Sequence, residues 1–235
     1  MPALPAPRTT DPSAITPRRL LDAAGEVFAE KGYRSATVRE ICERAHANVA
    51  AINYHFRGKE GLYRAVLRSA HRASVLKYPP DLGVESTAAP EKRLHAFVRS
   101  FMLRVFDEGQ PAWFGKLTSR EILEPTSALD SLVKDEIRPR WELVMSIVAE
   151  ILGRDVRKAE VRLAAMSVVG QCLFYFHSRS VIERLLPREL ADPAAAERLA
   201  EHITQFSLQA LRGARRATPA TMPKAAAGRG RRRRS

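Results

Sequence analysis

The chain has 235 residues, 45% of them hydrophobic and 28% charged, with a formal net charge of +13. This is the composition of a globular protein with ample core, and no apolar run reaches the roughly 18 residues that a membrane span needs. From Arg212 onward there are nine Lys and Arg residues and no acidic one, so residues 1–211 carry only +4. The excess charge therefore belongs to the terminus. It either adds salt-sensitive affinity for nucleic acid or is simply solvated.

Both ends differ in composition from the rest of the chain. Residues 1–14 are Pro-rich and lack the apolar stretch of a secretory signal, so we expect a disordered lead-in. Residues 213–235 are rich in Ala, Pro, Gly and Arg and predict a disordered basic tail. Cys42 and Cys172 both fall in apolar helical patterns, which favours packed thiols in a reducing compartment over a disulfide.

The first half of the chain predicts four helices, and no segment has the alternation of a strand. Pro17 begins a helix over 17–31, and Gly32 ends it. Thr37 and Glu40 form a capping box that begins a second helix over 37–45. His46 and Ala47 make a turn before a third helix over 49–55. Two short helices joined by a tight turn are the layout of a helix-turn-helix reader of DNA.

Later segments continue the helical pattern. A longer helix begins at Gly58 and runs to about residue 76, and a Pro-rich loop follows over 79–90. Further helices are predicted at 91–108, 111–123, 127–152, 156–180, 182–187 and 193–212. Pro139 should kink or break its helix near residue 138, because proline lacks a backbone N–H and clashes with the preceding turn.

Two of these helices predict self-association. The 156–180 segment is apolar almost all the way round, so one side can face its own domain while another needs a partner. A second copy of the chain is the simplest partner. The helix over 193–211 offers a second apolar stripe: Leu199, Ile203, Phe206 and Ala210. Two such helices per subunit would make a four-helix dimer interface.

The motifs of the first four helices resemble the TetR family of transcriptional regulators over about residues 15–67. The resemblance is carried by Ala24, Phe28, Gly32-Tyr33, Thr37-Val38-Arg39-Glu40-Ile41, Tyr54-His55-Phe56, Lys59-Glu60 and Leu62-Tyr63. The reading segment and two C-terminal stretches, Arg120–Thr126 and Val168–Tyr175, look most like the CecR (YbiH) subgroup. The resemblance implies an all-α fold. It would comprise a helix-turn-helix domain over 15–67 and a helical ligand-binding and dimerisation domain over 68–212.

The family resemblance also implies a homodimer that places two reading helices in successive major grooves of a roughly palindromic operator. By position, Asn48, Asn53, Tyr54 and His55 would lie on or near the exposed, base-facing side of the reading helix. An asparagine amide can read an adenine edge, and Tyr54 and His55 can reach phosphates or thymine methyls. Family positions that touch the DNA backbone are matched by Thr37, Arg39 and Lys59. For Tyr54 and His55 the alternative is packing between helices, and Ile52 and Phe56 are assigned to the core.

One position departs from the family pattern. Most members place glycine where His46 stands, because this turn residue often needs a positive φ. Histidine tolerates that conformation at a cost of about 1 kcal/mol, so we expect the turn to form.

An effector that releases the DNA is the family's usual control, and a pocket with aromatic walls and a few polar groups would suit a drug-like ligand. Candidate lining residues are Trp113, Phe114, Trp141, Met145, Gln171, Phe174, Tyr175 and His177, with Met166 beside them. Aromatic residues at helical spacing belong more often to a core than to a pocket, so these residues either line a pocket or pack in the core. Arg120 and Glu121 are expected to form an intersubunit or interhelical ion pair.

The sequence also bears on two other classes of protein. No catalytic or phosphate-binding motif is present and the six histidines lack metal-ligand spacing, so no enzyme, metal or cofactor is expected. The other rival is a sequence-nonspecific nucleic-acid-binding or architectural protein driven by the basic tail, which would lose nearly all its affinity at physiological salt. We expect a cytoplasmic regulator, with repression as the family's usual action.

Overall fold

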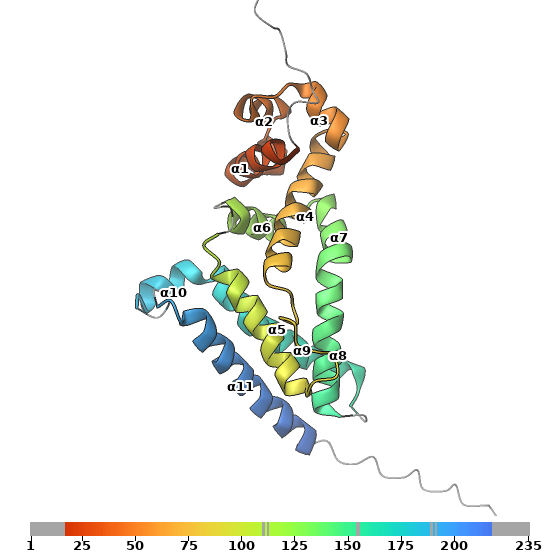
Figure 1. Cartoon of the computed structure of the whole chain (residues 1–235), viewed down its shortest axis with the longest axis vertical. Coiled ribbons are helices and arrows are strands. Elements are labelled where there is room, and N and C mark those ends of the chain that lie inside the picture. Colours follow the sequence, from red (N-terminus) through yellow and green to blue (C-terminus); the bar gives the residue numbers. More distant parts are fainter. Residues whose placement is uncertain are drawn as a thin grey trace, which may run out of the picture.

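The computed structural model describes residues 17–109, 111, 113–153, 156–188, 190 and 192–217, and these ranges contain helices and no strand. The all-α prediction is therefore confirmed. The molecule is elongated, with α1, α2 and α3 at one end and α11 running along the other (Figure 1). The helices are α1 Pro17–Ser35, α2 Val38–Ala45, α3 Val49–Phe56, α4 Lys59–Lys77, α5 Pro90–Val105, α6 Trp113–Leu123, α7 Ser127–Leu132, the π-helical turn η2 Val133–Ile137, α8 Arg138–Leu152, α9 Lys158–His177, α10 Arg179–Leu185 and α11 Ala195–Ala217.

The first three helices and the start of α4 enclose one apolar core. Phe28, Ile41, Ile52 and Leu62 are fully buried there. Ile52 is thus a core residue as predicted, whereas Phe56 is only half-buried and packs against the edge of this core. The apolar spacing within each helix puts these side chains on one face, which fixes how the helices stack.

Local capping explains where α2 and α3 begin. The Thr37 hydroxyl accepts a hydrogen bond from the Glu40 N–H at 3.2 Å, and the Glu40 carboxylate accepts one from the Thr37 N–H at 3.1 Å. The predicted capping box is therefore present. Hydrogen bonds from Lys31 and then from Thr37 lower the pKa of Glu40 to about 2. Asn48 caps α3 by accepting the Ala51 N–H at 3.1 Å.

The turn between α2 and α3 forms with histidine in the left-handed conformation, as expected. His46 has φ 48° and ψ 47°. Its N–H bonds to the Glu43 carbonyl at 3.2 Å, and the Ala47 N–H bonds to the Cys42 carbonyl at 2.8 Å. This pair of bonds is the Schellman arrangement that usually takes glycine. Gly32 (φ 78°) likewise interrupts α1, although one more helical turn follows it to Ser35.

A second core joins α5, α8, α9 and α11. Leu94, Val144, Ala165 and Ile203 are among its fully buried residues. The two cores do not divide at residue 67. Leu117 of α6 and Ala128 of α7 belong to the first core, because α6 packs on α1 and α7 packs on α4.

Pro139 shapes the segment over 127–152 as predicted. The helix does not continue straight through, and a π-helical turn, η2, lies directly before α8 begins at Arg138. In a regular α-helix the proline ring would clash with the backbone carbonyl of the residue four positions earlier, Asp135. The wider π-turn removes that conflict, so the segment keeps its helical path but changes pitch.

Helix α9 turns one apolar face to its own bundle and another outward. Leu163, Met166 and Phe174 are 66%, 56% and 56% exposed, and the exposed Gly170 lies between them on the same face. By length and composition α9 is the one described helix that could cross a membrane. It packs against α5, α8 and α11, however, which is the behaviour of a bundle helix.

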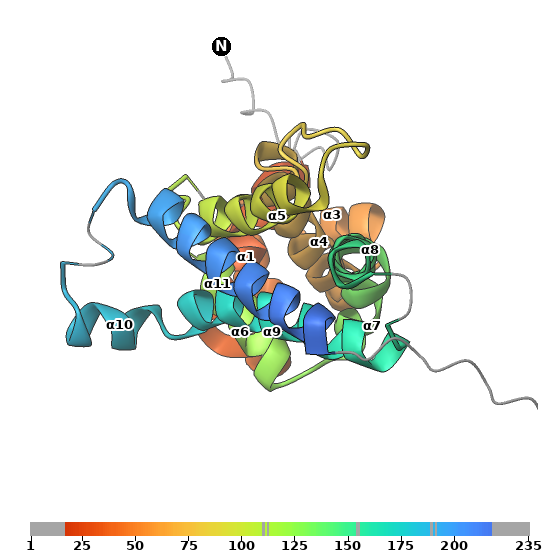
Figure 2. The ribbon, with the colours of Figure 1, turned by 90° about the horizontal axis from the view of Figure 1, so that it is seen from below.

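Helix α11 is longer than predicted and its apolar stripe is split. It continues past Arg212 to Ala217, so the first residues of the expected basic tail are helical, and residues 218–235 lie outside the described part. Leu199 and Ile203 pack into the second core, whereas Phe206 and Ala210 point outward. Figure 2 shows α11 crossing the bundle beside α5, with α10 projecting away from it.

The two thiols are free and lie in different cores, as expected from their patterns. Burial raises the pKa of Cys42 and raises that of Cys172 to about 12. Both sulfurs are therefore protonated and unreactive at neutral pH.

Candidate nucleic-acid interface

The outer face of α3 presents four side chains at the end of the molecule. Val49, Ala50, Asn53 and Tyr54 are exposed, Tyr54 by 77%. Ala51 and Ile52 lie on the opposite, buried face. An eight-residue helix with a small, partly polar outer face fits the width of a DNA major groove. Of the predicted base-facing residues, Asn53 and Tyr54 are thus well placed.

The other two predicted base-facing residues have other contacts. The Asn48 side-chain oxygen accepts the Ala51 N–H, so only its amide nitrogen remains to donate. His55 is half-buried and stacks edge-on against Tyr54 with ring centroids 4.9 Å apart. Its Nε2 is buried and has no hydrogen-bond partner within the part of the chain described. His55 therefore faces the inner side of α3 rather than its groove-facing side.

The predicted backbone contacts surround this helix. Thr37 is exposed at the start of α2, and the Arg39 guanidinium is 87% exposed although it pairs with Glu43 at 2.9 Å. Lys59 lies at the start of α4, where its ammonium donates to the Arg34 carbonyl at 3.1 Å. It also sits 4.8 Å from the centroid of the Tyr33 ring. Lys59 thus ties α4 to the end of α1 as well as facing solvent.

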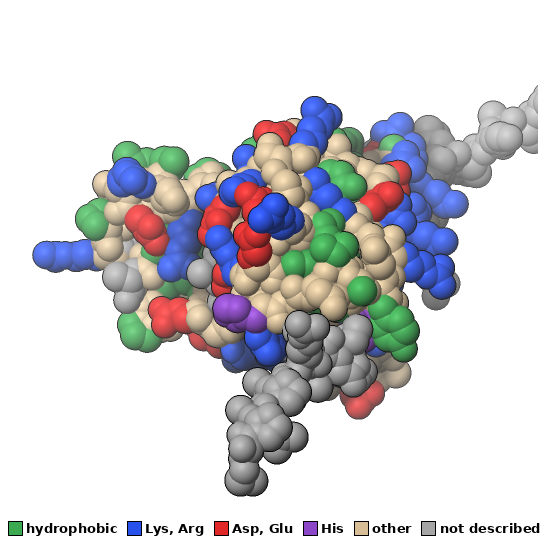
Figure 3. All heavy atoms as spheres, turned by 90° about the horizontal axis from the view of Figure 1, so that it is seen from above, with side chains coloured by type: hydrophobic (Ala, Val, Ile, Leu, Met, Phe, Trp, Pro, Cys, Tyr) green, Lys and Arg blue, Asp and Glu red, His purple; other side chains and the backbone are tan. Residues whose placement is uncertain are grey.

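Sequence reasoning missed Arg57. It ends α3 with φ 61° and is exposed beside the residues predicted to face the bases. The signal was its place directly before Gly58, at the turn between two helices. Seen from this end of the molecule, Lys and Arg side chains lie around the margin with acidic side chains among them (Figure 3). A mixed surface of this kind agrees with the small net charge of residues 1–211.

A buried hydrogen-bond network joins this end to the rest of the chain. The carboxyl group of Glu121 on α6 is fully buried and accepts the Tyr63 hydroxyl of α4 at 2.6 Å. It also accepts the Thr126 N–H at 2.9 Å and the Thr126 hydroxyl at 3.0 Å. Burial, then the bond to Glu121, raises the pKa of Tyr63. The expected ion pair of Glu121 is therefore wrong. Arg120 instead approaches Glu124, which directly follows α6, at 3.9 Å.

Helix α6 also contacts α1 directly. A Cβ atom placed on Gly25 would lie 2.3 Å from Cε2 of Trp113, so only glycine lets the indole ring lie on α1 there. The Arg120 side chain lies against Gly32 near the end of the same helix. These contacts hold α6 against α1, which itself packs on α2 and α4.

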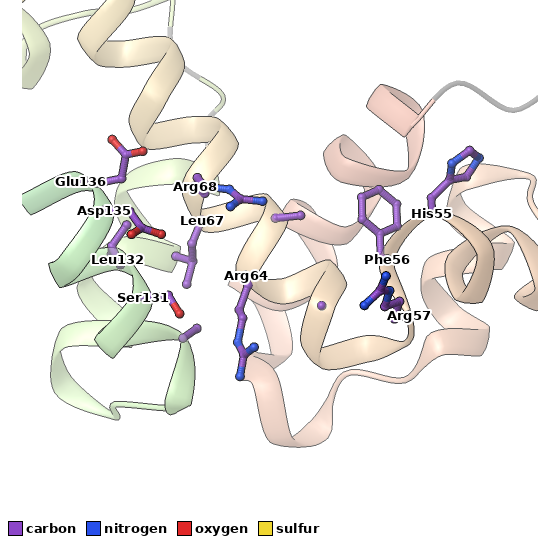
Figure 4. Close-up of a pocket in the computed structure, with 13 residues that line it drawn as sticks. His55, Phe56, Arg57, Arg64, Leu67, Arg68, Ser131, Leu132, Asp135 and Glu136 are labelled. Atoms are coloured by element: carbon purple, nitrogen blue, oxygen red, sulfur yellow. The ribbon is translucent and has the colours of Figure 1, made fainter.

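A pocket of about 370 Å³ lies between the base of the reading helix and the α7–η2 segment (Figure 4). Its apolar walls include Phe56, Leu67, Ala128 and Leu132. Its charged lining comes from α3–α4 on one side and η2 on the other: Arg57, Arg64, Arg68, Asp135 and Glu136, with His55 at the edge. The volume is within the range of small-molecule sites.

The residues predicted to line an effector pocket do not converge. Trp113 packs into the first core, while Trp141, Met145 and Tyr175 lie at the edge of the second. Gln171 donates to the Ser207 hydroxyl of α11 at 3.1 Å. Phe114 is buried on α6. Met166, Phe174 and His177 are exposed, the first two on the outer face of α9.

Phe114 does mark a buried polar cluster. Its ring packs edge-on against His71 of α4, with centroids 5.2 Å apart. The Nε2 of His71 and the hydroxyl of Thr118, one turn from Phe114, are buried without hydrogen-bond partners among the described residues. Burial, aided by the charges of Arg140 and Arg104, lowers the pKa of His71 to about 4. Burial likewise lowers the pKa of Arg104 to about 10.

Acid should destabilise the protein through His71. The unfolded imidazole takes up a proton near pH 6.5, whereas the folded one does so only near pH 4. Stability from the neutral form is therefore complete above pH 6.5 and is lost as the pH falls to 4, by up to about 3 kcal/mol. Chemical denaturation at fixed protein concentration should show this slope, and His71→Gln should flatten it. An equally steep slope in that variant would contradict the assignment.

The fold and the exposed short helix define a helix-turn-helix DNA-binding protein, and the comparisons identify its kind. The profile of bacterial regulatory proteins of the tetR family matches residues 20–66. The profile of the C-terminal domain of the HTH-type transcriptional dual regulator CecR matches residues 90–211. The chain therefore belongs to the TetR family of DNA-binding transcriptional regulators, a non-enzymatic family, and carries a CecR-type C-terminal domain.

Similarity to individual proteins agrees with this family assignment. The chain is 28% identical over 166 residues to the dual regulator CecR of Shigella flexneri, covering 67% of this chain and 74% of the relative. It is 38% identical over 80 residues to the regulator SrpR of Pseudomonas putida, covering 34% of this chain but only 38% of SrpR. That second match thus spans well under two thirds of the relative's length.

Solved structures share the fold. A putative transcriptional regulator of Pseudomonas aeruginosa PAO1 aligns with a TM-score of 0.66 at 17% identity, covering 88% of this chain and 97% of that one. FadR of Bacillus subtilis, solved in complex with stearoyl-CoA, aligns with a TM-score of 0.60 at 16% identity, covering 82% and 98%.

Proposed function

We propose that the chain is a cytoplasmic homodimeric repressor that binds a palindromic operator and releases it when a small-molecule effector binds. The observation that supports this proposal most directly is the outer face of α3. Asn53 and Tyr54 are exposed there, on a helix capped at both ends. Asn53 reads a base edge in the major groove. Thr37, Arg39, Arg57 and Lys59 contact phosphates on either side and set the register.

The dimer is supported by the unpartnered apolar face of α9. Leu163, Met166 and Phe174 form a stripe on which Gly170 allows close approach of a second helix. On α11, Phe206 is 58% exposed and points outward beside it. Two copies of these faces packed about a twofold axis would bury both stripes. A dimer also explains operator symmetry, since each copy reads one half-site.

Asn53→Ala is expected to weaken binding to the selected operator by about 1–3 kcal/mol while leaving affinity for random duplex DNA unchanged. The side chain is exposed, and it makes no hydrogen bond to any other described residue. Sites are first selected from random DNA with the purified protein, and affinities are then measured at physiological salt. An equal loss on both DNAs would exclude a base-reading role for Asn53.

Salt separates this proposal from the alternative, a sequence-nonspecific binder driven by the basic tail. Full-length protein and a variant lacking residues 218–235 are titrated with operator and random DNA over a range of salt concentrations. The repressor proposal requires that operator preference survive removal of the tail, with a shallower salt slope. Loss of the preference with the tail would favour the alternative.

A further inference from the structure

The Lys59 ammonium at the start of α4 is held by two contacts with the end of α1. It donates to the Arg34 carbonyl at 3.1 Å and lies over the Tyr33 ring, 4.8 Å from its centroid. An ammonium has three N–H donors, so two remain for a DNA phosphate after the bond to Arg34. No side chain among the described residues caps the N-terminus of α4, and its first backbone N–H groups therefore also favour an anion at this place.

The Tyr33 ring is in turn held by a second tyrosine, Tyr63 of α4. The centroids of the two rings are 4.8 Å apart. Tyr63 is 1% exposed, and Phe28 of α1 packs edge-on against it with centroids also 4.8 Å apart. Tyr33 is half-buried, so it extends from this buried aromatic cluster to Lys59 at the surface.

The hydroxyl group of Tyr63 fixes the position of that buried ring. It donates to the Glu121 carboxylate at 2.6 Å, and Glu121 is fully buried. Glu121 also accepts the Thr126 N–H at 2.9 Å, so its carboxylate is held from both sides. An unbroken line of contacts therefore runs from α6 to Lys59, just beyond the end of the reading helix.

We propose that Tyr33 is a positioning residue that holds the Lys59 ammonium in place for a DNA phosphate. Tyr63, which is tied to Glu121, keeps the Tyr33 ring beneath that ammonium. The proposal rests on the phosphate contact proposed above for Lys59. A lysine side chain loses much conformational entropy when it is fixed. The ring face attracts the ammonium and restricts the side chain before DNA arrives, so less entropy is lost on binding.

DNA binding over a series of salt concentrations tests the proposal, because the salt slope reports the number of phosphate contacts. The full-length protein and its variants are titrated with the selected operator and with random duplex DNA. Lys59→Ala should reduce the slope of log affinity against log salt by about one on both DNAs. Tyr33→Leu should also reduce the slope, although it removes no charge, and should weaken both affinities about two- to fivefold at physiological salt. A tyrosine that only supported the fold would leave the slope unchanged.

Further variants separate the positioning effect from a loss of stability. Tyr33→Phe keeps the ring beneath the ammonium and should keep the wild-type slope and affinity. Tyr63→Phe keeps both rings but loses the bond to Glu121, and it should weaken both affinities about threefold, in line with one hydrogen bond. Tyr78→Leu is the matched control, because the Lys77 ammonium lies over the Tyr78 ring, 5.2 Å from its centroid, at the other end of α4. This variant should change neither slope nor affinity.

Double variants show whether the two tyrosines act through Lys59. Tyr33→Leu and Tyr63→Phe should each lose their effect on DNA affinity in the Lys59→Ala background. A wild-type slope in Tyr33→Leu, or the same fold-change from it with and without Lys59, would overturn the proposal. If Tyr33→Leu does not fold, Tyr63→Phe decides the question because every ring stays in place. Unchanged affinity in Tyr63→Phe, or an equal loss in the Lys59→Ala background, would contradict the positioning role. A wild-type slope in Lys59→Ala itself would instead refute the phosphate contact on which the proposal rests.

Discussion

Glu121→Ala is expected to lower the free energy of unfolding by about 4 kcal/mol. The fully buried carboxyl group accepts hydrogen bonds from Tyr63 and Thr126, which belong to different elements. Truncation leaves the Tyr63 hydroxyl and the Thr126 N–H unpaired, each at about 1–3 kcal/mol, and opens a cavity between α4 and α6. Equilibrium unfolding by urea, followed by circular dichroism, measures the change.

Glu124→Ala is the matched control, since this glutamate directly follows the last residue of α6 and its side chain is 73% exposed. It should alter stability by less than about 0.5 kcal/mol. Tyr63→Phe should cost about 1.5–3 kcal/mol in the wild-type background and much less in Glu121→Ala, because the hydrogen bond is already lost there. Additive losses in the double variant would mean that the two side chains are not coupled.

Phe174→Glu is expected to convert the proposed dimer into a monomer and to weaken operator binding at least about 100-fold. Phe174 is 56% exposed on the outer stripe of α9, and each of the two copies would bury one Phe174 ring in a dimer. Burying two such rings contributes about 3–6 kcal/mol, and a carboxylate in their place adds a desolvation cost. In the proposed dimer each copy reads only one half-site, so operator affinity falls when dimerisation is lost. Sedimentation and operator titration measure the two effects.

Leu76→Glu provides the comparison, because Leu76 is 75% exposed but stands near the end of α4, away from α9. It introduces the same charge in place of an exposed apolar side chain and should leave the oligomeric state unchanged. If the Phe174→Glu protein sediments like wild type, the α9 stripe is not part of the dimer interface. Monomerisation of both variants would show that any added charge suffices, and the assignment to the α9 stripe would fail.

The features that the sequence predicted well are local. Thr37 accepts a hydrogen bond from the Glu40 N–H, and Asn48 accepts one from the Ala51 N–H. The residues of each pair are three positions apart, so the geometry of a helix start brings them together. His46 adopts its positive φ because the turn requires it. Pro139 forces an irregular turn on the helix that contains it. None of these outcomes needs knowledge of a distant element.

The effector candidates failed to converge for the opposite reason. Trp113, Phe114 and Phe174 all lie on apolar helical faces, but an amphipathic period does not tell which of several surfaces a face will meet. The first packs on α1, the second on His71, and the third faces outward. The stripe on α11 divides in the same way, with Ile203 inward and Phe206 outward.

By itself, the sequence determined the all-helical class, the helix-turn-helix and its family, because these rest on periodicity, caps and turn residues close along the chain. Only the tertiary structure decided that Glu121 meets Tyr63 across 58 positions, that α6 lies on α1, and that a pocket lies between α4 and the α7–η2 segment. Such contacts depend on how whole helices are oriented. That orientation is set by the sum of many packing interactions and is not encoded in any single segment.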